Sequence, residues 1–257
     1  MGQGFISKYI LRDIAGFIRK RKGTTEEIKP VDMAAELESI PTFEDGKQAE
    51  YDRFWDAYQE NGKRTDYRFA FSGLGWTAET LKPKYDIIPK SVQLMFRAMQ
   101  IPVNISDFFE SQGVVLDFSK TTSFAEMVLD SNIIGFGTVD TRAASNINYA
   151  FSTAKNLQTI RLLILKDDGS QLVTAAFNNC PALVDITFEG VIGKSGLNLQ
   201  WSTKLSKASI ESIVGCLSTT TSGLSITLSK TAVNAAFTTE EWTALEQTRP
   251  NWTISLV

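Results

Sequence analysis

The chain has 257 residues, of which 43% are apolar and 21% charged, with a formal net charge of −3. These values are typical of a globular protein, and the slightly acidic balance argues against binding to a nucleic-acid backbone. The sequence contains no histidine, which excludes Ser-His-Asp triads, imidazole bases and histidine-containing zinc sites. Its two cysteines, Cys180 and Cys216, are predicted to be buried thiols rather than metal ligands. No metal or cofactor is expected.

The first 41 residues predict two short helices. Residues 5–18 place apolar side chains at helical spacing, and the basic run 19–22 suits the C-terminal end of that helix. A second helix is predicted between Asp32, as its cap, and Pro41. Because two short helices with narrow apolar faces bury little alone, we expect residues 1–41 to dock on another part of the chain or on another subunit.

The start of the chain has no charged beginning, long apolar core or cleavage site of a secretory signal peptide. No apolar run is long enough for a transmembrane helix. A protein made in the cytoplasm and not inserted into a membrane is therefore expected.

Residues 42–80 are predicted to form a linker helix and a cap. The aromatic residues of the first half recur at helical spacing: Tyr51, Phe54, Trp55 and Tyr58. Residues 67–76 alternate and then break at glycines, which indicates a strand and a turn. A cap is needed here because the first unit of a repeat array would otherwise expose its core.

Residues 81–200 contain a pattern that recurs at spacings of 23 to 26 residues in its central part. In each unit two apolar residues flank a polar one, and two further apolar residues follow four positions apart. Equivalent positions are Phe124, Ile147 and Val173, then Val128, Phe151 and Phe177, then Phe136, Ile160 and Ile186. Periods of this length are typical of solenoids. The sequence therefore predicts an α+β leucine-rich-repeat solenoid with a parallel ladder of strands.

Each unit is predicted to place its strand on one side and a helical turn on the other. The residues that flank the polar position should point inward, because side chains alternate along a strand. The apolar pair four positions apart should share one face of a helical turn. Phe151 is expected to lie in the core. An earlier, longer copy of the unit is predicted around residues 85–96.

Residues 201–257 predict a C-terminal cap in which the repeat decays. Apolar residues at helical spacing run from Ile210 to Leu217. Residues 224–228 alternate as a strand, Thr239 is predicted to cap a helix, and residues 252–256 form a final strand.

The polar position of the strand supplies the candidate binding face: Asp86, Asp117, Asp140 and Lys166. In a parallel ladder equivalent side chains lie about 4.8 Å apart, so three stacked carboxylates would repel unless a cation or a basic ligand covered them. The alternative is a set of solvated acids separated by loop insertions. Asp117 and Asp140 are also the one carboxylate pair that a glycan hydrolase could use, and no enzyme activity is expected.

Four tryptophans admit two interpretations: Trp76, Trp201, Trp242 and Trp252. They could stack on sugars, or they could be core residues of the two caps, which is the commoner place for aromatic residues in capping segments.

The central units resemble BspA-type leucine-rich repeats. The resemblance is carried by Ala176-Phe177-Asn178-Asn179-Cys180-Pro181-Ala182-Leu183 with Ile186, which matches the Ala-Phe…Cys…Leu…Ile signature of those repeats. The unit around Phe151 departs from it, with Ala154 at the cysteine position. The resemblance implies a repeat domain that binds other proteins or surfaces.

Both ends of the chain are similar to segments of structural proteins from phages and prophages of Gram-positive gut bacteria. The segments are Ile14-Ala15…Ile18-Arg19…Gly23-Thr24-Thr25…Pro30-Val31-Asp32-Met33-Ala34, then Leu228-Ser229-Lys230-Thr231-Ala232-Val233-Asn234, then Trp242-Thr243-Ala244-Leu245 and Asn251-Trp252-Thr253-Ile254. This similarity implies a virion protein, associated with the tail or baseplate, whose N-terminal helices bind other virion proteins. Its repeats would bind a host receptor or glycan. The alternative is a bacterial surface adhesin, for which the sequence shows no secretion signal or wall anchor.

Overall fold

The computed structural model describes residues 65–68, 70–72, 76–78, 81–83 and 85–257, all of which belong to the second of the chain's two units, residues 55–257. The predicted N-terminal helices and the predicted linker helix lie outside these residues.

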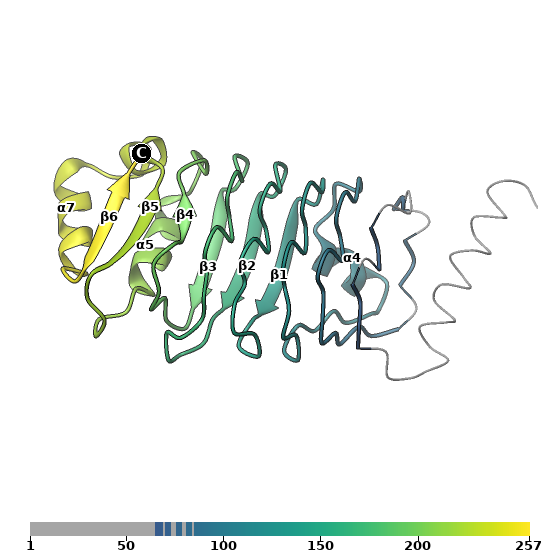
Figure 1. Cartoon of the computed structure of the whole chain (residues 1–257). Coiled ribbons are helices and arrows are strands. Elements are labelled where there is room, and N and C mark those ends of the chain that lie inside the picture. Colours follow the sequence, from purple (N-terminus) through teal and green to yellow (C-terminus); the bar gives the residue numbers. More distant parts are fainter. Residues whose placement is uncertain (1–64, 69, 73–75, 79–80, 84) are drawn as a thin grey trace, which may run out of the picture. The chain divides into compact units, whose positions relative to one another are not determined.

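The described residues form a mixed α and β structure whose strands all pair in parallel (Figure 1). There are two three-stranded sheets, β1-β2-β3 and β4-β5-β6, and four helices within this part of the chain. In chain order the elements are α4 (Ile105–Ser111), β1 (Gly135–Asp140), β2 (Thr159–Ile164), β3 (Asp185–Glu189), β4 (Asn198–Leu199), α5 (Lys207–Gly215), β5 (Leu224–Leu228), α6 (Lys230–Ala236), α7 (Thr239–Gln247) and β6 (Trp252–Leu256).

The first sheet confirms the predicted parallel pairing of successive units. Phe136 of β1 lies opposite Ile160 of β2, which lies opposite Ile186 of β3. All three side chains are buried, because they occupy equivalent positions on the inward face of neighbouring strands.

The segments predicted as helical turns are instead pairs of β-turns. In four successive units two residues with positive φ lie four positions apart: Leu94 and Ala98, Glu126 and Asp130, Tyr149 and Thr153, Ala175 and Asn179. The first of each pair is the third residue of a turn, as where the N–H of Ala150 donates to the carbonyl of Ile147 at 3.1 Å. A positive φ at that position is typical of a type II turn and is incompatible with a right-handed helix. The expected helical turn was therefore wrong.

These turns form a second ladder because alternate residues bond to the next unit. Ile147, Tyr149, Phe151 and Thr153 donate N–H groups to the carbonyls of Leu172, Thr174, Ala176 and Asn178, at 2.8 to 3.3 Å. The same pattern links Val92, Leu94, Phe96 and Ala98 to Ser123, Ala125, Met127 and Leu129. Bonds between units thus replace the internal bonds of a helix and satisfy the backbone.

A column of aromatic rings fills the space between the two ladders. Phe151 stacks on Phe177 with ring centroids 5.0 Å apart and meets the edge of Phe136 at 5.9 Å. The apolar positions predicted to form the core are buried with at most 1% exposure: Phe124, Val128, Ile147, Phe151, Val173 and Phe177. The predicted spacing therefore identified the core correctly, although the backbone of the turn differs.

Helix α5 covers the open edge of β3. The N–H groups of Ile186 and Phe188 donate to the hydroxyls of Ser209 and Ser212 on α5, at 2.9 and 2.8 Å. The Ser209 hydroxyl in turn donates to the carbonyl of Val184 at 3.1 Å. Two serines therefore replace the backbone of a fourth strand, and the edge does not remain open to pairing with another chain.

The C-terminal part contains the predicted helix, strand, helix and strand as α5, β5, α7 and β6, but a helix that was not predicted, α6, lies between β5 and α7. The strands β5 and β6 begin and end at the predicted residues. Helix α7 begins at Thr239, but its cap is Thr238, which forms a capping box with Glu241. Lys207 of α5 pairs with Glu241 of α7 at 2.7 Å, which connects these two helices.

The turn geometry predicts opposite effects for two adjacent alanines. Ala175 has a φ of 50° and is half-buried, so Ala175→Gly is expected to raise the free energy of unfolding by about 0.5 to 1 kcal/mol. Ala176 is fully buried and has no positive φ, so Ala176→Gly is expected to lower it by about 1 kcal/mol. Urea melts of both variants test this, and equal losses would contradict the turn assignment.

Candidate functional site

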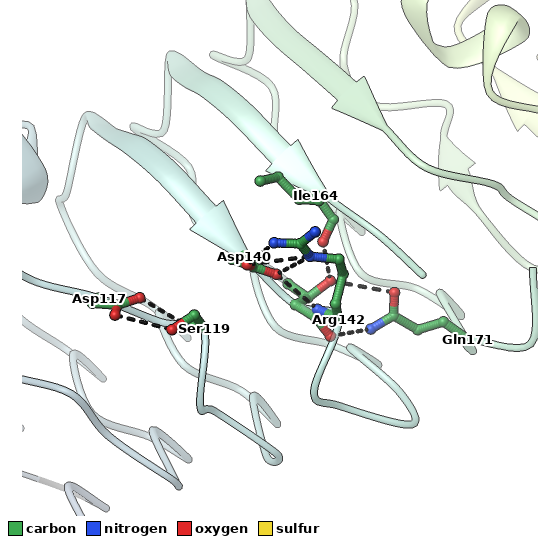
Figure 2. A network of polar contacts seen from close by, with 7 residues as sticks. Asp117, Ser119, Asp140, Arg142, Ile164 and Gln171 are labelled. Carbon is green, nitrogen blue, oxygen red and sulfur yellow. Dashed lines mark hydrogen bonds and ion pairs between the residues drawn. The ribbon is translucent and has the colours of Figure 1, made fainter. Parts of the chain in front are cut away.

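Two of the predicted acidic residues, Asp117 and Asp140, lie at the ends of strand segments, where they close turns. The carboxylate of Asp117 accepts the N–H of Ser119 at 2.8 Å and its hydroxyl at 2.9 Å. Asp140 accepts the N–H of Arg142 at 3.0 Å and forms an ion pair with its guanidinium at 2.7 Å (Figure 2). A side chain that accepts the N–H two residues later forms an Asx turn. Both carboxylates therefore bond within their own turn.

The structure does not bring the four candidate residues together in one column. Asp86 accepts the N–H of Val115 at 2.8 Å. Asp140 lies in register with Ile164 rather than with Lys166, which follows the end of β2. Figure 2 shows Asp117 with Ser119 as a pair separate from the contacts around Asp140.

Behind Asp140 lies a buried polar network centred on Gln171, which is 1% exposed. Its amide nitrogen donates to the carbonyls of Thr141 and Ala144, at 2.8 and 3.2 Å. The Thr141 hydroxyl donates to the carbonyl of Ile164 at 2.7 Å (Figure 2). These bonds tie the end of β1 to β2 and the following loop, so the network holds this part of the fold together.

The ion pair of Asp140 predicts a loss of stability in acid. The hydrogen bond from Arg142 lowers the pKa of this carboxyl below its ordinary value, against the opposing effect of burial. Its stabilising contribution is therefore present above the pKa of the unfolded state, about 4, and is lost as the pH falls through the lower folded value.

Urea melts at pH 7 and pH 2 measure this contribution. The stability difference between wild type and Asp140→Asn should shrink at the lower pH. In Arg142→Gln the pH dependence of the unfolding free energy that Asp140 causes should be smaller. This variant lacks the guanidinium whose hydrogen bond lowers the pKa of Asp140. A difference between wild type and Asp140→Asn that stayed constant with pH would show that the ion pair does not stabilise the fold.

A hollow of about 300 Å³ lies beside β1. Its lining comes from α4, from the segment that follows α4, and from β1 and β2: Ser106, Glu110, Val114, Val115, Leu116, Gly137, Thr138 and Arg161. Arg161 forms an ion pair with Asp107 of α4, and both side chains are about half exposed. The hydroxyl of Ser106 is buried and has no hydrogen-bond partner. Ligand sites are commonly hollows of at least about this size with a few polar groups.

Glycine in β1 permits the close approach of α4 and Arg161. A Cβ on Gly137 would lie 3.0 Å from the Cβ of Ser106 and 3.1 Å from the guanidinium of Arg161. Sequence reasoning missed this site. The Gly135-x-Gly137 pair within a strand was the available signal, because glycine in a strand often marks a close approach.

The four tryptophans that could be core residues or sugar-stacking platforms differ in exposure. Trp76 and Trp252 are buried, at 4% and 6% exposure, and the indole N–H of Trp252 donates to the carbonyl of Ser218. Trp242 is half-buried against Phe237. Trp201 is 54% exposed, which leaves its ring available for contact.

Both cysteine thiols were predicted to be buried, but the structure buries only one of them fully. Cys180 is buried and burial raises the pKa of its thiol to about 12, so it is not a nucleophile at neutral pH. Cys216 is half-buried, and burial also raises its pKa.

Within the described part of the chain, no group of three or more acidic residues and cysteines is arranged to hold a metal ion. None of the helices there is both long and apolar enough to cross a membrane.

A scan against protein-family models, a search of the curated proteins and a search of the solved structures each found no match to this chain.

Proposed function

We propose that this protein is a non-enzymatic binding protein built on a leucine-rich-repeat solenoid. The observation that carries the proposal is the pair of parallel ladders. One ladder joins strands and the other joins turns, at nearly the same spacing along the chain. A repeat array of this kind presents a long surface for binding rather than one enclosed cleft.

The carboxylates support a binding role rather than catalysis. Hydrolysis of a glycan would need two carboxyl groups that face one scissile bond. Asp117 and Asp140 instead bond within separate turns, to Ser119 and to Arg142. We infer that these aspartates shape the outer surface and that a ligand is bound by its other groups.

We further propose that the protein is part of a phage particle, associated with the tail or baseplate. This part of the proposal rests on the similarity of residues 14–34 and of the C-terminal segments to phage structural proteins. Residues 1–41 would bind other virion proteins or a second copy of the chain, and the repeats would bind a receptor or glycan of the host surface. Neither nucleic acid nor membrane insertion has a part in this function.

Immunogold electron microscopy of particles from a producing culture tests the location. The antibody is raised against residues 85–257, and an excess of the purified protein serves as the blocking control. Gold at one end of the tail, abolished by the competitor, is the expected result. Gold on intact cells and none on particles would replace the virion proposal with the surface adhesin.

A further inference from the structure

The strand ladder is interrupted between Leu116 and β1. On one side Leu116 forms a parallel bridge with Ile87, through the N–H groups of Ile87 and Asp117. On the other side Asn104 bridges to Gly135, but the chain then leaves β1 as α4. The ladder therefore opens beyond Gly135 and resumes at Leu116 on the far side of the hollow.

The break leaves polar groups without partners. The N–H and carbonyl groups of Leu116 make no hydrogen bond with any residue that the structure describes. They face away from Ile87, because the groups of successive residues in a strand point to opposite sides. The buried hydroxyl of Ser106 is the third such group at this site. The unpaired buried hydroxyl of Ser106 costs about 1 to 3 kcal/mol, which a ligand that pairs with it would recover, whereas the backbone groups of half-buried Leu116 are open to pairing.

The remaining lining favours a ligand that is extended and largely uncharged. Val115 is 58% exposed, and it supplies an apolar surface beside the unpaired backbone. Arg161 is the cation of the hollow, and Glu110 and the neighbouring Asp107 offset its charge. The lining contains no aromatic side chain on which a sugar ring could stack. The two acids also disfavour a polyanion.

We propose that this hollow binds an extended peptide segment, which pairs with Leu116 and fills the break in the ladder. The ligand's backbone would bond to the N–H and carbonyl of Leu116, as in strand addition to a sheet edge. Its carbonyl groups would accept hydrogen bonds from Ser106 and Arg161. The inference rests on the proposed binding function and names the ligand class of one site on its surface.

Nuclear magnetic resonance with a defined peptide set tests the inference on the full chain. The probes are four capped hexapeptides of the form (Thr-X)3, in which X is valine, isoleucine, serine or aspartate. At least one should produce a saturable shift of the Leu116 backbone amide. The variant Ser106→Leu, which fills the hollow, should weaken that binding at least tenfold. Ser111→Leu lies on the exposed part of the same helix and should bind like the wild type.

Three outcomes would overturn the inference. The first is that no peptide shifts the Leu116 amide. The second is that Ser106→Leu binds as tightly as wild type, or, where that variant fails to fold, that Arg161→Leu does. The third is that glucose, galactose, rhamnose or N-acetylglucosamine shifts the amide and the peptides do not. None of these results bears on the particle location, which the immunogold experiment decides separately.

Discussion

Replacing Phe151 with alanine is expected to lower the free energy of unfolding by about 3 to 5 kcal/mol. The ring is fully buried between Phe136 and Phe177, and the backbone of Phe151 belongs to the turn ladder. Its removal would leave a cavity that the ladders on both sides keep from closing. The loss would therefore include both the buried apolar area and the cavity.

Tyr149→Ala is the matched control for this experiment. Tyr149 lies two residues earlier, in the preceding turn of the same pair, but its side chain is 48% exposed. Its φ of 58° is unfavourable for tyrosine and alanine alike, so the backbone strain does not change. Urea melts should show a loss of less than about 1 kcal/mol for this variant. A loss of that size in Phe151→Ala would contradict the central position of the aromatic column.

The double variant Ser209→Ala, Ser212→Ala is expected to have a free energy of unfolding about 2 to 6 kcal/mol below that of the wild type. Each hydroxyl accepts the N–H of a residue in β3, Ile186 and Phe188 respectively. Helix α5 would still cover the strand, so water could not readily replace the missing acceptors. Each donor left unpaired costs about 1 to 3 kcal/mol.

The control for the serine variants is Ser255→Ala, because Ser255 is an exposed serine on β6. The free energy of unfolding of this control variant should stay within about 0.5 kcal/mol of the wild-type value. Hydrogen exchange provides a second readout, since the amides of Ile186 and Phe188 should exchange faster in the double variant. Unchanged exchange at both amides would show that the serines do not close this edge.

Much of the fold followed from the spacing of apolar residues. Phe151 and Phe177 were placed in the core because the same side chain recurred after 26 residues, and the structure buries both. The strands β5 and β6 were predicted from alternation alone. Periodicity reports which residues share a buried face, and this information survives errors in the backbone conformation.

The conformation of the turns could not be read in the same way. An apolar pair four residues apart fits a helical turn, but it also fits two β-turns in succession. Of the positive-φ residues in the four units, Asp130 and Asn179 are of types that adopt this conformation readily, whereas Leu94, Tyr149 and Thr153 are not. The bonds between units that stabilise the turns involve backbone atoms and leave no mark in the sequence.

The candidate binding face depended on the register between neighbouring strands, and the spacing of apolar residues does not determine that register. The pairing of β1 with β2 places Asp140 opposite Ile164, two residues before Lys166, and no bridge joins Leu116 to β1 among the described residues. The polar residues therefore do not align as a strict ladder would require. The roles of Ser209 and Ser212 were also missed, because a serine in a helix gives no sign that it will accept a bond from a neighbouring strand.

The most direct test of the solenoid is the removal of one whole unit. Deleting residues 147–172 joins Asn146 to Val173, and the bridge between Asn146 and Leu172 shows that this replaces one residue by its equivalent in the next unit. Because each unit of a solenoid contacts its neighbours alone, the shortened chain should keep its circular dichroism spectrum and unfold in one cooperative, less stable transition. Deleting residues 147–159, half a unit, would place a strand against turns and should unfold the protein. If the whole-unit deletion unfolds as completely as the half-unit deletion, the described residues do not form a stack of equivalent units.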